Sequence, residues 1–159
     1  MAKKPQKTDR ILIATNRKAR FHYEILEDFE AGIELKGPEV KSLRDRKVSF
    51  EGTYARVEDT GIFLHKLYIA PYPQNTLEDI PPTRTRKLLL HKREIRRLKE
   101  EQDSRRLTIV VLEIYFRRGW AKIRIALARG KKHADKRDSL RKKDAAREME
   151  RSFKGKFKR

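Results

Sequence analysis

The last 31 residues place the strongest limit on what this chain can fold into. Residues 129–159 contain 14 Lys or Arg and 5 Asp or Glu, with only a handful of large apolar side chains. A segment of this composition cannot bury enough apolar surface to offset the entropy that it loses on ordering. We therefore expect a basic C-terminal tail over residues 130–159 that is disordered when free and helical when bound to a strongly anionic partner.

Charge is distributed unevenly over the rest of the chain. Of the net charge of +19, residues 1–20 contribute +6 and residues 21–128 only +4. This pattern predicts a nearly balanced folded domain over residues 16–129, preceded by a basic N-terminal arm over residues 1–15. Two basic extensions on a balanced domain are typical of a protein that binds nucleic acid.

The chain has no cysteine, which excludes disulfides and Cys-ligated zinc. Its basic start is not followed by the apolar run of a signal peptide. The most apolar stretch, Leu107–Phe116, is interrupted by Thr108 and Glu113 and is too short to cross a bilayer. These features favour a cytoplasmic protein, which we expect to be a monomer with no membrane partner.

Short strands make up most of the predicted structure. Alternating apolar and charged residues predict them in two parts of residues 21–35 and over residues 53–58, 62–70, 107–116 and 120–128. The turns at residues 59–61 and 117–119 each contain glycine and would join the last four strands into two hairpins.

Two helices and one long loop separate these strands. Pro38 suits the first position of a helix, which predicts a short helix over residues 38–46. Apolar residues at helical spacing over residues 87–102 predict a second helix. Residues 71–86 are rich in proline and lack periodicity, so we expect an exposed loop. The chain is thus mainly β with short helices, and we expect a small antiparallel OB-like β-barrel, a fold that commonly binds RNA.

No group of residues indicates an enzyme. The four histidines are scattered and lack the spacing of metal ligands. Carboxylates alternate with Lys and Arg, as on a solvated surface, and no glycine-rich phosphate loop is present. We therefore expect no catalytic residue, no cofactor and no metal.

The basic cluster from Asn16 to Arg20 is the first candidate for an RNA contact. Arg17, Lys18 and Arg20 can bind phosphates, and the amide of Asn16 can read a base edge or a sugar hydroxyl. The alternative is a solvated basic segment that leads into the first strand, and the residue pattern does not separate the two.

The segment from Arg84 to Leu90 is the second candidate. Arg86 and Lys87 can bind phosphates, and an exposed Leu88 or Leu89 can contact an unstacked base. Packing in the core is the alternative for either leucine. Glu30, by contrast, is by composition a solvated residue at the end of a strand.

The tail contains a sparse helical pattern. Asp138 can cap a helix whose thin apolar stripe includes Leu140, Met149 and Phe153. Charge pairs such as Glu150–Lys154 add only a few tenths of a kcal/mol each, so an isolated helix is marginal. The alternative is a helix that docks on its own barrel.

Several motifs occur in a specific order along the chain. They are Asn16-Arg17-Lys18-Ala19, Glu30-Ala31-Gly32-Ile33, residues 37–44 (GPEVKSLR), 52–57 (GTYARV), 86–90 (RKLLL) and 128–132 (ARGKK), and Asp135-Lys136-Arg137. Each motif is weak alone, but the ordered set, from about residue 10 to the tail, resembles the small protein B family, the tmRNA-binding proteins of bacterial trans-translation.

This resemblance implies a non-enzymatic RNA adaptor. Members of the family form an OB-like barrel that binds the tRNA-like domain of tmRNA, promotes its charging with alanine and delivers it to stalled ribosomes. Alanyl-tRNA synthetase and elongation factor Tu are implied as indirect partners through tmRNA. The residues that match the tmRNA-facing surface are Asn16, Arg17, Lys18, Glu30 and Leu89, to which the basic clusters add Arg20, Arg86 and Lys87.

The resemblance also assigns the tail to the ribosome. The residues implied at the decoding centre of the small subunit are Gly130, Lys131, Lys132, His133, Asp135, Lys136 and Arg137. Those implied in the empty mRNA channel are Arg141, Lys142, Lys143, Arg147, Met149, Arg151 and Phe153. Relatives commonly carry an aromatic ring or His immediately before the Asp-Lys-Arg triplet, where this chain has Ala134; His133 is the candidate substitute.

The leading hypothesis is thus an RNA-binding adaptor for ribosome rescue. The alternative is a structural RNA-binding protein of the ribosome or of another ribonucleoprotein particle. A third class, an RNA-processing enzyme, would need a carboxylate or histidine cluster that the sequence does not contain.

Overall fold

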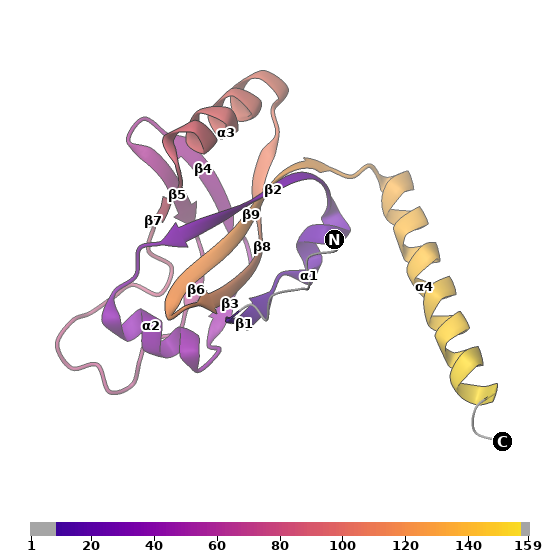
Figure 1. The fold of residues 1–159 in the computed structure, drawn as a ribbon, viewed down its shortest axis with the longest axis horizontal. Coiled ribbons are helices and arrows are strands. Elements are labelled where there is room, and N and C mark those ends of the chain that lie inside the picture. The colour runs from indigo at the N-terminus through magenta and orange to yellow at the C-terminus, as the bar shows by residue number, and fades with distance from the viewer. Residues whose placement is uncertain (1–8, 157–159) are drawn as a thin grey trace, which may run out of the picture.

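Seven strands form one antiparallel sheet that curls round and nearly closes on itself (Figure 1). The computed structural model describes residues 9–156. Within this range the elements are β1 (Arg10–Thr15), α1 (Arg17–His22), β2 (Tyr23–Ile33), α2 (Gly37–Arg44), β3 (Val48–Ser49), β4 (Tyr54–Glu58), β5 (Gly61–His65), β6 (Tyr68–Ile69), β7 (Arg86–Leu89), α3 (Lys92–Arg105), β8 (Thr108–Arg117), β9 (Trp120–Gly130) and α4 (His133–Lys156).

The strand order explains how the sheet curls. The order is β1-β8-β4-β5-β7-β2-β9, and β9 pairs back onto β8. One edge of β8 is shared by two strands, because β1 pairs with it at residues 113–117 whereas β4 meets it only at Ile109, opposite Ala55. Bulges in β1, β2 and β8 add the bend that such a sheet needs. Between the two partners, a short stretch of the β8 edge has no strand beside it.

The core lies inside this sheet and at its two ends. In β9, Ile123, Ile125 and Leu127 are buried while their neighbours Lys122 and Arg124 face outward. Leu43 of α2 and Leu98 of α3 are completely buried and extend the same core, and Figure 1 places these two helices at opposite ends of the sheet. The predicted antiparallel sheet, both glycine-containing hairpins and the helix after Gly37 are confirmed.

Several segments differ from the prediction. Residues 21–35 hold one long strand instead of two, because the bulge between Ile25 and Glu27 interrupts the alternation without ending β2. Residues 87–89, predicted as helix, belong to β7, and α3 starts only at Lys92. Arg10–Thr15, expected in the basic arm, forms β1, whereas residues 1–8 of that arm lie outside the described residues. The short helix α1 and the two-residue strand β3 were not predicted, and residues 62–70, predicted as one strand, form β5 and β6 with a break at residues 66–67.

A buried ion cluster fixes the proline-rich loop between β6 and β7. Glu39 of α2 accepts hydrogen bonds from Arg84 Nε at 2.9 Å and Nη2 at 2.7 Å, and from Arg86 Nε at 2.9 Å and Nη2 at 2.7 Å. Burial by itself would raise the pKa of Glu39, but the bonds from Arg84, from the Lys36 backbone and from Arg86 outweigh it and lower the pKa.

The tail forms the helix α4 in this structure, and its disorder without a partner stays a prediction. α4 is a single helix that begins at His133, five residues before the predicted cap at Asp138, and it projects away from the sheet (Figure 1). Leu140, Met149 and Phe153 remain exposed on it, so its apolar stripe does not dock on the barrel. No helix in residues 9–156 is long and apolar enough to span a membrane.

Candidate nucleic-acid interface

Asn16 places α1 on the outside of the sheet. Its side-chain Oδ1 accepts a hydrogen bond from Ala19 N at 3.3 Å, which caps the helix. Its Nδ2 donates to Val111 O at 3.0 Å, and its backbone N–H donates to Leu112 O at 2.7 Å. These two carbonyls lie where β8 has no neighbouring strand, so Asn16 satisfies the open part of that edge. Its amide is therefore largely engaged within the fold.

Small residues let α1 lie close to the strands beneath it. Ala19 is buried against Ala126 and Ala128 of β9 and against Val110 and Leu112 of β8. This second apolar cluster on the outer face of the sheet was missed in the sequence, where residues 16–20 resemble a plain basic segment. Its consequence is that Ala19 holds α1 on the sheet while Arg17, Lys18 and Arg20 remain exposed.

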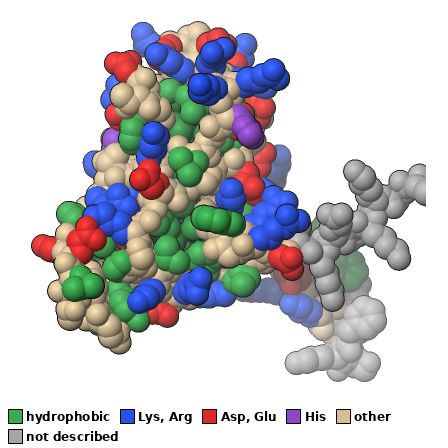
Figure 2. All heavy atoms as spheres, turned by 60° about the vertical axis from the view of Figure 1, so that its left-hand side comes forward, with side chains coloured by type: hydrophobic (Ala, Val, Ile, Leu, Met, Phe, Trp, Pro, Cys, Tyr) green, Lys and Arg blue, Asp and Glu red, His purple; other side chains and the backbone are tan. Residues whose placement is uncertain are grey.

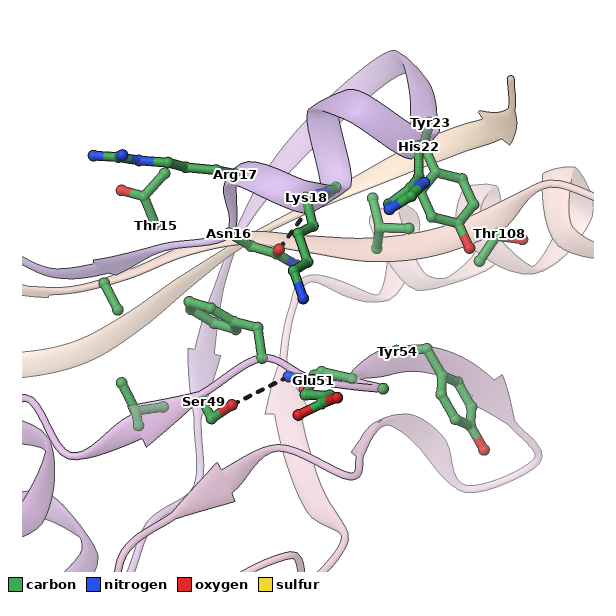
Figure 3. Close-up of a pocket in the computed structure, with 17 residues that line it drawn as sticks. Thr15, Asn16, Arg17, Lys18, His22, Tyr23, Ser49, Glu51, Tyr54 and Thr108 are labelled. Atoms are coloured by element: carbon green, nitrogen blue, oxygen red, sulfur yellow. Dashed lines mark hydrogen bonds between the residues drawn. The ribbon is translucent and has the colours of Figure 1, made fainter. Parts of the chain in front are cut away.

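The cations of α1 are free to bind an anion. Arg17, Lys18 and Arg20 are exposed, and none of them pairs with a carboxylate within residues 9–156. Figure 3 shows Lys18 directed into a groove below the helix and Arg17 directed away from it. The groove has a volume of about 870 Å³ and separates α1 from residues 48–54.

Glu30 lies on the outer face of β2 in a network of hydrogen bonds. It accepts one from the hydroxyl of Tyr115 and another from Arg117 Nη1 at 3.1 Å. Burial raises the pKa of Glu30, but the Tyr115 bond and the charges of Arg117 and Lys122 outweigh this and lower it overall. Burial and the bond to Glu30 raise the pKa of Tyr115 to about 12. Glu30 is therefore a carboxylate whose charge is already matched and which orients a cation and a hydroxyl.

Three residues near Glu30 were not identified from the sequence as candidates. Trp120 is 74 % exposed and pairs with Arg117 at the tip of the β8–β9 hairpin. Lys122 and Arg124 follow on the same outer face of β9, since alternate residues of a strand share a face. That these three side chains share one face follows only from the strand register, which the sequence does not show. A single Trp next to two arginines and a glycine could still have marked this hairpin tip as a candidate RNA contact.

β7 contributes one apolar and one basic side chain beside this face. Leu89 is 55 % exposed and lies opposite Gly32 of β2. A Cβ at position 32 would be 3.2 Å from the Cβ of Leu89, so glycine leaves the room that Leu89 occupies. Lys87 is exposed on the same strand.

Arg86 does not belong to the surface. Its side chain is completely buried, and it donates to Glu39, to Leu67 O at 2.6 Å and to Pro82 O at 3.0 Å. Burial lowers the pKa of Arg86, against the opposing effect of Glu39. The prediction that Arg86 binds phosphate is therefore corrected: the residue holds the loop before β7 in place.

The tail residues named in the sequence are spread along an exposed helix. Gly130 ends β9, and Lys131 contacts α1 through its backbone and its ammonium group. His133 and Ala134 are both exposed at the first turn of α4, and Asp135 Oδ2 accepts from Lys132 N at 3.4 Å. Lys136 is half-buried. The other tail residues are exposed, namely Arg137, Arg141, Lys142, Lys143, Arg147, Met149, Arg151 and Phe153.

Basic side chains dominate other parts of the surface as well. Figure 2 shows Lys and Arg gathered at the top of the molecule over α3, and apolar side chains between basic ones on the face below. No group of three or more His, Cys, Asp or Glu suited to a metal occurs among residues 9–156. Unpaired cations beside exposed apolar and aromatic groups on a β-sheet define a class of protein, the RNA-binding proteins.

Comparison with known proteins identifies the family within that class. The family model described as SmpB protein matches residues 13–155, and the chain belongs to this family of non-enzymatic RNA-binding proteins. It is 47 % identical over 148 residues to an SsrA-binding protein of Elusimicrobium minutum, covering 93 % of this chain and 94 % of the relative. It is 50 % identical over 153 residues to that of Aquifex aeolicus, covering 95 % and 98 %.

A solved structure supports the same assignment. The structure described as "tmRNA-SmpB: a journey to the center of the bacterial ribosome" contains a chain 51 % identical to this one, with a TM-score of 0.64. The match covers 80 % of this chain and 94 % of that one.

Proposed function

We propose that this protein binds the tRNA-like domain of tmRNA and delivers it to stalled ribosomes for trans-translation. The observation that carries the proposal is the set of unpaired cations on α1, Arg17, Lys18 and Arg20, in a chain of the SmpB family. The relatives are named for binding SsrA, and the similar solved chain is described with tmRNA and the ribosome. The sheet then serves as an OB-like barrel, and its outer face holds the RNA.

The proposed tmRNA surface combines α1 with the neighbouring outer face of β2 and β7. Cations fix phosphates, Glu30 holds Arg117 in position, and the exposed Leu89 offers apolar contact to an unstacked base. Asn16 acts mainly by holding α1, because its amide is engaged with the fold. The residues proposed here are Asn16, Arg17, Lys18, Arg20, Glu30, Lys87 and Leu89.

The tail is proposed to bind the ribosome and not tmRNA. The residues that would enter the decoding centre are Gly130, Lys131, Lys132, His133, Asp135, Lys136 and Arg137. The rest of α4 would lie in the mRNA channel that a truncated message leaves empty. Two observations support this proposal. Nearly every described side chain of the basic helix α4 is exposed, and the tail is joined to α1 near the start of that helix, through Lys131. Alanyl-tRNA synthetase and elongation factor Tu would interact indirectly, through tmRNA, with a monomeric protein in the cytoplasm.

Charge-matched variants test the α1 surface. Replacing Arg17, Lys18 and Arg20 with Ala should weaken binding to tmRNA. It should also make the affinity less dependent on salt. Each lost phosphate contact reduces the steepness of log binding constant against log salt concentration by about 0.7–0.9. The control replaces Arg93, Arg96 and Lys99, three exposed cations of α3, with Ala. Equal weakening by both triple variants would mean that net charge, and not the α1 surface, determines binding.

A shortened chain tests whether the barrel binds tmRNA and the tail binds the ribosome. A chain that ends at Lys132 retains the backbone hydrogen bond from Lys131 N to His22 O. It should bind tmRNA with nearly full affinity and fail to rescue stalled ribosomes. Loss of both properties together, with unchanged unfolding of the barrel, would contradict the proposal. Stoichiometric binding to all ribosomes without tmRNA would favour a structural ribosomal protein instead.

A further inference from the structure

The groove beneath α1 has the chemistry of a nucleotide site. Its volume of about 870 Å³ falls within the range of about 300–1,000 Å³ that is usual for small-ligand sites. One wall is α1 with Lys18 and His22, and the other is the segment from Val48 to Tyr54. Phe50 is partly buried and lines the same groove, so the groove has both aromatic and basic side chains in its walls.

The groove exists because of how the sheet closes. β1 leaves β8 after Thr15, and β4 joins β8 only at Ile109. The space between the two strands is bridged by Asn16, which holds α1 above it, and not by a further strand. The groove is therefore built into the backbone, and its width does not depend on one flexible side chain.

The ring of Tyr54, at the mouth of the groove, is fixed in orientation by stacking on a neighbouring ring. Its ring stacks on that of His65 with 5.0 Å between centroids and 18° between planes. His65 is fixed in turn by Glu58 at 2.9 Å and by Thr85 at 3.4 Å. One face of Tyr54 is thus covered, and the residue remains 37 % exposed.

We propose that this groove binds one unstacked nucleotide of single-stranded RNA, with its base on Tyr54 and its phosphate near Lys18, whose side chain is directed into the groove. Stacking on an aromatic ring accepts any base, while the ammonium group of Lys18 neutralises a flanking phosphate. Glu51 on the opposite wall is the one acidic residue of the groove, and it can accept a hydrogen bond from a base amine. Paired RNA is excluded because its bases are stacked within the duplex.

Variants at two exposed tyrosines test the proposal, which rests on the proposed function. The probe is a short single-stranded RNA that contains 4-thiouridine, offered to the full-length protein. Tyr54→Leu should weaken binding about tenfold to a hundredfold, whereas Tyr54→Phe keeps the ring and should stay within about twofold. Tyr68→Leu is the control, since Tyr68 is similarly exposed at 41 % but does not line the groove.

Photocrosslinking locates the bound nucleotide. A crosslink within residues 48–58 is expected, and a crosslink confined to other segments would overturn the proposal. Equal affinity of the Tyr54→Leu and Tyr68→Leu variants, or equal binding of the same RNA as a duplex, would also overturn it. If wild-type protein binds tmRNA normally while Tyr54→Leu has no effect, only the groove proposal fails. If wild-type protein does not prefer tmRNA over other RNAs, the proposed function fails instead.

Discussion

Lys131 joins the tail to the backbone of Arg20, the last basic residue proposed for the tmRNA surface. Its Nζ donates to Arg20 O at 3.1 Å and to the hydroxyl of Ser139 at 3.1 Å, while its backbone N–H donates to His22 O at 2.9 Å. The ammonium group lies at the C-terminal end of α1, where a cation is favoured by the helix dipole. One side chain thus connects α1 with the second turn of α4.

The direction of α4 should depend on this lysine. In Lys131→Met the backbone bond to His22 remains, but the two hydrogen bonds of the ammonium group are removed, at a cost of about 1 kcal/mol each. The chain has no cysteine, so cysteines introduced at Asp59 and Asp144 can carry spin labels. We expect the distance distribution between the two labels to broaden in Lys131→Met.

Lys132→Met is the control for this measurement. Lys132 is the exposed neighbour of Lys131 and has the same charge. An equally broad distribution in both lysine variants would show that the direction of α4 is not set by the Lys131 side chain.

Glu39 should be the most sensitive ionisable position for stability. In Glu39→Gln the buried guanidinium of Arg86 loses its charged partner, which costs about 3–5 kcal/mol in the free energy of unfolding. Denaturation by urea measures this loss. The double variant Glu39→Leu with Arg86→Met removes both buried charges and should recover much of the stability. A double variant as unstable as Glu39→Gln would indicate that the loop before β7 needs the ion pair itself.

The same carboxylate makes stability depend on pH. The pKa of Glu39 is lowered in the folded chain, so its contribution is present above the pKa of the unfolded chain and is lost as pH falls through the folded pKa. The wild-type protein should therefore lose stability on acidification more steeply than Glu39→Gln. Parallel curves of unfolding free energy against pH would contradict this assignment.

Elements with local signals were predictable from the sequence. The hairpins around Gly61 and Gly119 follow from turn chemistry, and Pro38 marks the start of α2. In β9 the larger apolar residues Ile123, Ile125 and Leu127 occupy alternate positions because one of its faces is in the main core. These features need only neighbouring residues, which is why pattern and propensity were sufficient.

Features that depend on distant residues were not predictable. Arg86 follows other cations in the sequence, but its partner Glu39 is 47 residues earlier. Leu88 and Leu89 fit a helix as well as a strand, and only their pairing with β2 and β5 places them in β7. α1 has six residues, too few for a periodic signal. In the candidate interface, Glu30 was named through resemblance, whereas Tyr115 and Trp120 join it only through strand register.

Tyr115 should contribute stability that is lost in alkaline solution. Its pKa is raised from 10.0 to about 12 by burial and by the bond to Glu30. A raised folded pKa means that the contribution is complete below about pH 10 and falls as pH rises toward 12. The difference in unfolding free energy between wild type and Tyr115→Phe should thus shrink over this interval. A constant difference would mean that the hydroxyl is not buried in the way described.

Gly32 should control the position of Leu89. In Gly32→Ala the new Cβ lies 3.2 Å from the Cβ of Leu89, which must move by a few tenths of an ångström. Gly32→Val adds further bulk, and overpacking typically costs about 1–3 kcal/mol. We expect tmRNA affinity to fall in the order wild type, Gly32→Ala, Gly32→Val. Gly37→Ala is the control, because nothing lies within 4 Å of its Cβ, and it should leave affinity unchanged.

α4 should exchange its amide hydrogens much faster than the sheet, although it is helical. Leu140, Met149 and Phe153 are 45 %, 67 % and 67 % exposed, so no buried apolar surface stabilises the helix. The Glu150–Lys154 pair, at 2.6 Å, adds only a few tenths of a kcal/mol. Local opening of residues 138–154 should therefore cost little, and exchange detected by mass spectrometry should be nearly unprotected there while residues 108–117 of β8 are protected. Protection of α4 equal to that of β8 would show that the helix packs against the barrel in solution. Protection that appears only on addition of ribosomes would support a tail that is exposed in the free protein and binds the ribosome.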